Sequence, residues 1–223
     1  MRALVVADIH GDLEALVKLR RSAEDKGYDR FFLLGDYSRD YKDEERNISD
    51  VKSILNMLSD YEVSAIPGNC DHSSVISIFE EGNASLHNRV LNLQGTAIIG
   101  FGGSNTTPFN TPLEYDEKVI LDSLNNLHSM VQKGSKVILM AHAPPKDTGC
   151  DVIAAGIHVG SSAVRGYIES KKPDLVLCSH IHENGGVEDA IGGTRIVNIG
   201  RISEGRAYVL DIGETISLES YSA

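Results

Sequence analysis

The sequence predicts an α/β fold with two sheets. Five short apolar runs without period-2 alternation are separated by amphipathic stretches, a pattern typical of parallel strands that helices cover on both faces. Toward the C-terminus, strand-like segments are separated by glycines, which indicates antiparallel hairpins. Because no repeat, low-complexity linker or change in composition divides the 223 residues, we expect one domain spanning residues 1–223.

The elements follow from these patterns in chain order. The expected buried strands are residues 3–7, 31–34, 63–66, 137–141 and 175–178. Apolar residues at helical spacing predict helices at 13–26, 50–58 and 116–131, and a further helix capped at Ser161 or Ser162 and ended by Pro173. The segments expected to pair antiparallel are 88–93, 97–101, 195–198, 207–210 and 215–218. The charged stretch 39–50 is interpreted as a solvated surface loop.

Composition excludes several classes of function. With 32 Asp and Glu against 21 Lys and Arg, the net charge is −11 and no basic patch interrupts it, which argues against nucleic acid as a primary partner. The three cysteines have no paired spacing, so we expect reduced thiols. No apolar run suits a signal peptide or a membrane span, so the expectation is a cytoplasmic protein without a membrane partner.

Each of the five buried strands ends in a residue type that binds metals. The carboxyl ends of parallel strands form the ligand-binding edge of a sheet, and residues two apart in an extended segment point the same way. Taken singly, an Asp-x-His, a Gly-Asp turn or a lone histidine is common in loops and cores, but all of them in order favour one site. Seven nitrogen and oxygen ligands suit two ions. They are Asp8, His10, Asp36, Asn69, His142, His180 and His182.

This ordered set, Asp-x-His, Gly-Asp, Gly-Asn, His and His-x-His, resembles the calcineurin-like metallophosphoesterase family. Residues 102–105 and 158–161 are similar to a compact prokaryotic branch related to cyclic-nucleotide phosphodiesterases. The resemblance implies a four-layer αββα fold, in which two mixed sheets form a β-sandwich flanked by helices. It also implies that two divalent ions, from among Mn, Fe, Zn and Ni, serve as cofactors.

The resemblance further assigns roles to the seven residues. Asp8, His10 and His182 would bind the first ion, and Asn69, His142 and His180 the second. Asp36 would bridge the ions and so take part in catalysis. The implied reaction is hydrolysis of a small phosphodiester or nucleotide-like phosphate by a hydroxide that bridges the two metals.

Three positions depart from the family pattern. Cys70 stands where many members carry a histidine that is proposed to protonate the leaving group. The acidic residue that pairs with this histidine in the family is here Asp71, which is therefore a candidate catalytic residue. His72 is a candidate to take over as the catalytic acid; water as the acid, or a structural or substrate-contact role for His72, stays open. Ser179 replaces the usual glycine before His-x-His. The segment after Asp36 lacks the Asp-Arg-Gly extension of protein phosphatases, which argues against that role.

Candidate substrate contacts are Asn69, Asn105, His158 and Arg201. A simple turn at Asn105 and an ordinary loop histidine at His158 are the alternatives. Two other functions compete with a phosphoesterase that acts on a small phosphate ester. One is a non-catalytic metal-binding scaffold on the same fold, and the other a nuclease, which the missing basic surface disfavours. The sequence leaves open whether the protein forms a homo-oligomer.

Overall fold

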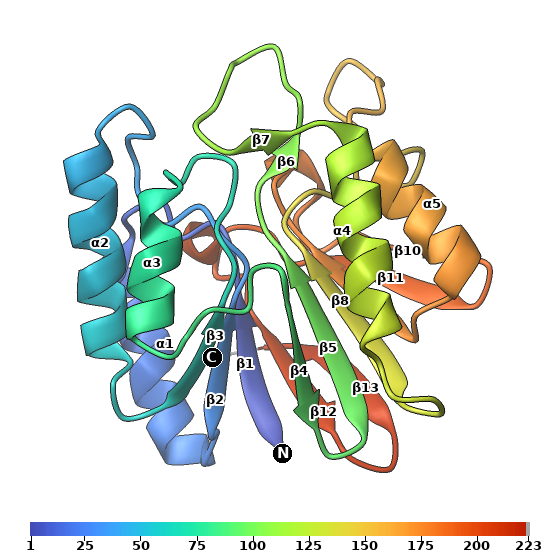
Figure 1. The fold of residues 1–223 in the computed structure, drawn as a ribbon. Helices are drawn as coiled ribbons and strands as arrows, with labels where there is room; N and C mark the ends of the chain where they lie inside the picture. Colours follow the sequence, from blue (N-terminus) through green and yellow to red (C-terminus); the bar gives the residue numbers. More distant parts are fainter. Residues whose placement is uncertain (222–223) are drawn as a thin grey trace.

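The computed structural model describes residues 1–221 and arranges them in four layers, two sheets inside and helices outside (Figure 1). The strands are β1 (Arg2–Val6), β2 (Arg30–Leu33), β3 (Glu62–Ala65), β4 (Arg89–Leu93), β5 (Thr96–Phe101), β6 (Ser104–Asn105), β7 (Glu114–Tyr115), β8 (Lys136–Ala141), β9 (Leu175–Cys178), β10 (Glu188–Ile191), β11 (Thr194–Asn198), β12 (Tyr208–Ile212) and β13 (Ile216–Ser220). The helices are α1 (Leu13–Lys26), α2 (Glu44–Met57), α3 (Ser74–Glu81), α4 (Glu117–Ser129) and α5 (Ser162–Lys171), with short 3-10 turns η1 (His182–Asn184) and η2 (Ile202–Glu204). Among these described helices, none is both long and apolar enough to cross a membrane.

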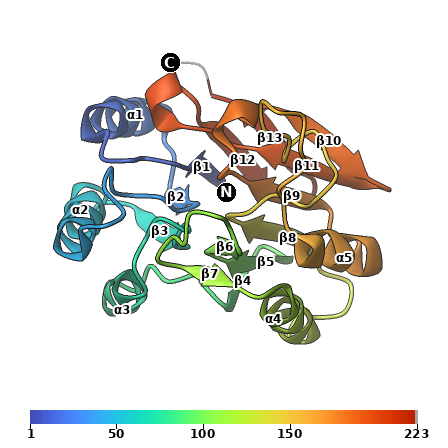
Figure 2. The same ribbon diagram turned by 90° about the horizontal axis from the view of Figure 1, so that it is seen from above.

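Both large sheets are mixed. One has the strand order β13-β12-β1-β2-β3, the other β10-β11-β9-β8-β5-β4, and β6 pairs with β7 in a separate two-stranded ribbon. The strands predicted to be parallel do pair in parallel, as β1-β2-β3 in the first sheet and β8-β9 in the second. Figure 2 shows α1, α2 and α3 covering the first sheet, and α4 and α5 covering the second.

Strands β5 and β11 differ in part from the expected antiparallel pairing. Each does pair antiparallel with one neighbour, β5 with β4 and β11 with β10. On their other edges they run parallel, β5 to β8 and β11 to β9. The hairpin signals of the sequence report only the local neighbour, so they miss the second partner that the sheet supplies.

The core alternates with the pleat of the strands. In β1, Ala3 and Val5 pack between the two sheets, whereas Leu4 and Val6 pack under the helices of the first sheet. Strand β8 divides its side chains in the same way between the central layer and the layer under α4 and α5. Burial on both faces explains why these strands are uniformly apolar in sequence. The α/β fold of two mixed sheets flanked by helices is thereby confirmed.

The main difference from expectation lies in residues 39–50. The interpretation of this stretch as a solvated loop is wrong for its second half, because α2 already begins at Glu44. The carboxylate of Asp43 accepts a hydrogen bond from the Arg46 N–H at 2.9 Å and so caps the helix. Asn47 on this helix is fully buried. Helix α3 is a further element that the periodicity does not predict.

Candidate metal centre

The seven predicted ligands lie where five strands end. Asp8 and His10 follow β1, Asp36 follows β2 and Asn69 follows β3 in the first sheet. His142 follows β8, and His180 and His182 follow β9, in the second sheet. The site therefore spans the carboxyl edges of both sheets, as expected for an α/β fold.

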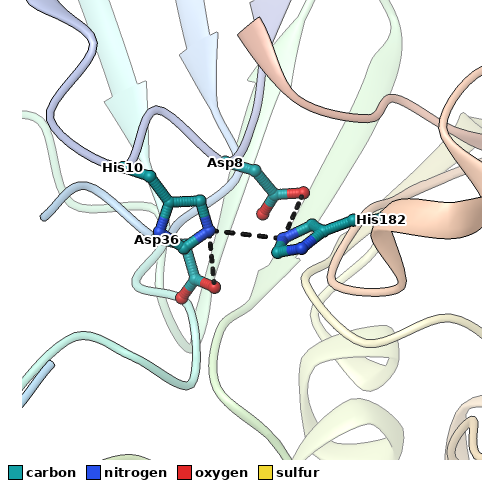
Figure 3. A group of neighbouring side chains, drawn as sticks. All are labelled: Asp8, His10, Asp36 and His182. Atoms are coloured by element: carbon teal, nitrogen blue, oxygen red, sulfur yellow. Dashed lines mark hydrogen bonds and ion pairs between the residues drawn. The ribbon is translucent and has the colours of Figure 1, made fainter. Parts of the chain in front are cut away.

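Four of these residues form one tight group. One possible ligand atom from each of Asp8, His10, Asp36 and His182 lies within 4.8 Å of the others. The Nε2 atoms of His10 and His182 are 3.3 Å apart, and His182 Nε2 is 3.5 Å from Asp8 Oδ2. His10 Nε2 is 3.7 Å from Asp36 Oδ2. Figure 3 shows the four side chains pointing toward one another, Asp8 and His10 from one segment and Asp36 and His182 from two others.

The remaining ligands adjoin this group through Asp36. His142 Nε2 lies 3.5 Å from Asp36 Oδ2 and 3.1 Å from Asn69 Oδ1. The His142 and His180 rings are neighbours, with centroids 5.3 Å apart. We call Asp8, His10 and His182 the Asp8 half of the site, and Asn69, His142 and His180 the His142 half; Asp36 belongs to both.

The contacts of His142 point its Nε2 atom at the oxygens of Asn69 and Asp36, where a cation could bind. Its Nδ1 donates to the Leu34 carbonyl at 2.6 Å, so in the neutral ring Nε2 carries only a lone pair. That lone pair faces the oxygens of Asn69 and Asp36, which are acceptors as well. Burial opposes a positive charge here, but Asp36 and Asp8 raise the pKa of His142 to about 9. A proton on Nε2 therefore occupies the place that a metal ion would take.

Asp36 stays ionised at the centre of the site. Burial alone would raise the pKa of this carboxyl, but the positive charge and hydrogen bond of His142, together with His10, hold the pKa well below its usual range. Asp8 differs, since burial raises its pKa against the attraction of His142. Asp8 Oδ1 is buried and has no hydrogen-bond partner in the part of the chain that the structure describes, so a cation would satisfy an otherwise orphaned oxygen.

The backbone is strained where these ligands sit. Asp8, His10, Asp36 and His180 all have left-handed φ angles, of 47°, 43°, 56° and 69°. For residues with a Cβ atom this conformation costs on the order of 1–2 kcal/mol each. Strain of this kind persists only where the surroundings impose it, and it concentrates at functional sites.

Two glycines let the second and third strand ends approach closely. A Cβ atom on Gly68 would lie 2.0 Å from Asp36 Oδ1. A Cβ atom on Gly35, whose φ is +98°, would lie 2.3 Å from the Gly68 nitrogen. The Gly-Asp and Gly-Asn motifs of the sequence therefore have a steric reason as well as a chemical one.

Asp71 supports Asp36 from below. Its buried carboxylate accepts hydrogen bonds from the backbone N–H groups of Asp36 at 2.8 Å, Tyr37 at 3.1 Å and Gly68 at 2.7 Å, and from Asn47 Nδ2 at 2.8 Å. Burial and the nearby Asp36 raise the pKa of Asp71 to about 6. These contacts give Asp71 a positioning role, because they hold the Asp36 and Gly68 backbones. The catalytic role expected for Asp71 from the sequence stays a prediction.

His72 lies on the side of α2. Its Nε2 is 2.9 Å from the Tyr41 carbonyl and its Nδ1 3.9 Å from Glu44, while its backbone N–H donates to Asn47 Oδ1 at 2.9 Å. These contacts hold the ring against the segment before α2. The role of His72 as catalytic acid stays a prediction.

Cys70 occupies the usual histidine position as a free thiol. Its backbone N–H donates to Asp36 Oδ1 at 2.9 Å. Burial and the negative charge of Asp36 raise the pKa of the thiol well above its ordinary value, so Cys70 is a protonated neighbour of the site and not a thiolate ligand.

Of the predicted substrate contacts, Arg201 reaches the Asp8 half, where its guanidinium contacts His182 Nδ1. Asn69 lies among the ligands. Asn105 Nδ2 donates to the Val159 carbonyl at 3.2 Å, and His158 Nδ1 lies 2.7 Å from Asp151 Oδ1. Asn105 and His158 thus tie the loops above the sheets, and their contact with a substrate stays a prediction.

The Ser179 hydroxyl donates to Asp8 Oδ2, so the serine that replaces the family glycine has a partner in the site. Sequence reasoning missed two other supporting residues. Asn47 and Thr111 contact Asp71 and Asn69, respectively. A helix-cap signal at Asp43 could have located Asn47, whereas no local pattern marks Thr111.

The donor set fits divalent metal ions. Carboxylate, imidazole and amide oxygen are ligands for Mn, Fe, Zn and Ni. A cation would satisfy the orphaned Asp8 oxygen, and at His142 it would replace the proton that Nε2 shares with Asn69 Oδ1. The geometry thus supports a metal ion at the group formed by Asp8, His10, Asp36 and His182.

Comparisons with known proteins agree with this geometry. A curated relative, the uncharacterised protein MJ1162 of Methanocaldococcus jannaschii, is 36% identical over 204 residues, which cover 89% of this chain and 87% of the relative. Among solved structures, a dimetal phosphatase from Danio rerio has a TM-score of 0.73 at 11% identity, covering 99% of this chain and 95% of its own. The protein TT1561 of Thermus thermophilus has a TM-score of 0.72 at 22% identity, covering 99% and 97%. At these identities the two structures show a common fold.

The family description "Calcineurin-like phosphoesterase" matches residues 1–184. This range includes all seven clustered ligands and the loops that carry them. On the match, the fold and the ordered ligand set together, the chain belongs to the calcineurin-like phosphoesterase family.

Proposed function

We propose that this protein is a two-metal phosphoesterase that hydrolyses a small phosphodiester or a nucleotide-like phosphate. The observation that supports the proposal most is that five strand ends bring carboxylate, imidazole and amide side chains together around Asp36. A pure scaffold has no need for strained ligand backbones or for a carboxylate oxygen left without a partner among the described residues.

Asp8, His10 and His182 would hold one ion, and Asn69, His142 and His180 the other, with Asp36 touching both. Mn, Fe, Zn and Ni are the candidate metals. Such ions would supply positive charge for the phosphoryl oxygens and lower the pKa of a water that attacks phosphorus.

The chain itself contributes orientation and charge. Asp71 holds the Asp36 backbone in its left-handed conformation, through a hydrogen bond from the Asp36 N–H. Arg201, on the rim of the Asp8 half, is placed to bind a phosphoryl oxygen once a substrate draws it from His182. The protonated Cys70 thiol adds no negative charge beside the incoming phosphate.

The test is hydrolysis of a panel of phosphomonoesters and phosphodiesters by metal-stripped protein reloaded with Mn²⁺, Fe²⁺, Zn²⁺ or Ni²⁺. We expect activity with at least one metal, and its loss in His142→Ala. The matched control is His128→Ala, because His128 lies on α4 and contacts Tyr167 at 3.0 Å, away from the site. No hydrolysis with any metal would favour the scaffold alternative, and full activity in His142→Ala would refute the assigned site.

A further inference from the structure

The Asn69 side chain has two faces with opposite chemistry. Its Oδ1 lies 3.1 Å from His142 Nε2, and its Nδ2 lies 3.0 Å from Thr111 Oγ1. The amide is nearly symmetric in shape, so its partners decide which atom points toward the metal centre. Only the oxygen is a metal ligand; the NH₂ group in its place would repel a cation.

Glu114 determines whether the Thr111 hydroxyl is a donor or an acceptor toward Asn69. The Thr111 hydroxyl is 2.5 Å from Glu114 Oε1. A carboxylate only accepts, and a hydroxyl has one hydrogen, so Thr111 donates its hydrogen to Glu114 and presents a lone pair to Asn69. Although burial opposes it, hydrogen bonds from Thr107 and Thr111 lower the pKa of Glu114, which keeps the carboxylate in its accepting form.

The same carboxylate closes the loop between β6 and β7. Glu114 accepts from the Thr107 N–H at 3.0 Å, the Thr107 hydroxyl at 2.6 Å and the Thr111 N–H at 2.8 Å. Leu113 adds a backbone bond to the Asn69 carbonyl at 3.1 Å. Phe109, at the tip of this loop, is 73% exposed. A ligand of the metal centre is thus joined to an exposed loop by a continuous chain of hydrogen bonds.

We propose that Thr111, oriented by Glu114, is a positioning residue that locks the Asn69 amide with its oxygen toward His142 and so completes the His142 half for a divalent cation. This inference rests on the proposed two-metal function. It also implies that a bound ion holds Thr111 in place, because the ion and Thr111 each fix the Asn69 amide.

The test compares Thr111→Val with Thr111→Ser and Thr107→Val. Valine keeps the shape of threonine but removes the oxygen acceptor of the Asn69 NH₂ group, which then keeps only its weaker contact with Cys70 Sγ at 3.7 Å. Serine keeps the hydroxyl. Thr107→Val is the matched control, because the Thr107 hydroxyl bonds Glu114 and the Phe109 N–H but not Asn69.

The readout is calorimetric titration of metal-stripped protein with Mn²⁺. We expect Thr111→Val to weaken one of two ions by roughly 10–100-fold, the usual effect of removing a group that orients a ligand, and the other ion to be unaffected. Thr111→Ser and Thr107→Val should bind both ions as the parent protein does.

Equal binding of both ions by Thr111→Val, or an equal loss in Thr107→Val, would overturn the proposal. Should Thr111→Val fail to fold, hydrogen exchange of the unmodified protein gives the answer, because Mn²⁺ should slow exchange of the Thr111 N–H; unchanged exchange would count against it. If the unmodified protein binds fewer than two ions, the proposed function fails first, and that result is distinct from failure of the Thr111 assignment.

Discussion

The two halves of the proposed metal centre differ in the burial of their histidines. The His142 side chain is fully buried, and its Nδ1 is held by the Leu34 carbonyl of the neighbouring sheet. In the Asp8 half, the side chains of His10 and His182 are each 24% exposed. His10 Nδ1 lies 3.2 Å from the Ser38 carbonyl, and His182 contacts the long side chain of Arg201.

This difference indicates that the His142 half holds a ligand fixed in advance, whereas the Asp8 half gives a substrate access to the site. Tight packing fixes the direction of His142 Nε2 before any ion arrives, and a fixed ligand loses little entropy on binding. His10 and His182 in the Asp8 half are partly exposed, and a phosphate would reach the site past them. We therefore expect changes in the His142 half to affect folding as well as metal binding, and changes in the Asp8 half to affect mainly metal binding.

The largest effect is expected where the halves meet. Asp36→Asn keeps the shape of the side chain but removes the charge that both halves share. Hydrolysis should fall by about 1000-fold, equivalent to about 4 kcal/mol of transition-state stabilisation. Steady-state kinetics with a phosphodiester under saturating Mn²⁺ checks this. A variant that keeps a tenth of the activity would break the idea of a shared carboxylate.

The second largest effect is expected at Asp71, whose carboxylate holds the backbone of Asp36. Asp71→Asn places an NH₂ group among four donors, and leaving buried donors unpaired should cost about 3 kcal/mol of unfolding free energy. Urea denaturation of the metal-stripped protein measures it. The control is Asp189→Asn, an exposed carboxylate that accepts from the Gly149 N–H, for which we expect a loss below about 1 kcal/mol. Equal losses would show that Asp71 has no special structural role.

The contrast between the halves is tested directly by His142→Ala against His10→Ala. Without metal, His142→Ala should lower the unfolding free energy by about 2–3 kcal/mol, since it leaves a cavity and removes the donor to the Leu34 carbonyl. His10→Ala should cost about 1 kcal/mol or less, because the ring is partly exposed. Thermal unfolding of both stripped variants gives the comparison, and the reverse order would contradict it.

The smallest expected effect is the pH dependence of metal binding, which comes from the proton on His142. Because Asp36 and Asp8 hold the pKa of His142 at about 9 against burial, this ring is protonated at pH 7 and must lose its proton when a metal binds. Desolvation lowers the pKa of His180 to about 4 and of His182 to about 3, so both are already neutral. Metal affinity at the His142 half should therefore rise with pH and level off above about 9.

Calorimetry at pH 7 in buffers of different ionisation enthalpy counts the protons. About one should be released by His142 on metal binding, and this release should disappear with a midpoint near pH 9. A metal affinity at the His142 half that is independent of pH between about 6 and 8 would contradict the account.

How much the sequence predicts follows from the range of each interaction. Apolar runs predict buried strands such as β1 and β8, and each strand end predicts its ligand, because strand direction alone brings Asp8 and His142 to one edge. The start of α2 was missed because the charge of this stretch suggested a solvated loop, while the Asp43 cap is a local signal of another kind.

Side-chain contacts between residues far apart in the sequence could not be predicted from local sequence patterns. Asp71 follows the Gly-Asn motif and invites a catalytic interpretation, yet its direction is set by backbone donors 34 and 35 residues away. Thr111 contacts Asn69 across 42 residues of chain. Such contacts depend on how loops close over the sheets, which neither period nor motif encodes.

The most direct test of the central claim is electron paramagnetic resonance of the metal-stripped protein titrated with Mn²⁺. Two ions held on either side of Asp36 would be ~3.5–4 Å apart, and we predict an exchange-coupled signal that saturates at two ions per chain. The same titration of Asp36→Asn should give only uncoupled Mn²⁺. If the unmodified protein gives only uncoupled signals throughout the titration, including at saturation, the two-metal centre is contradicted.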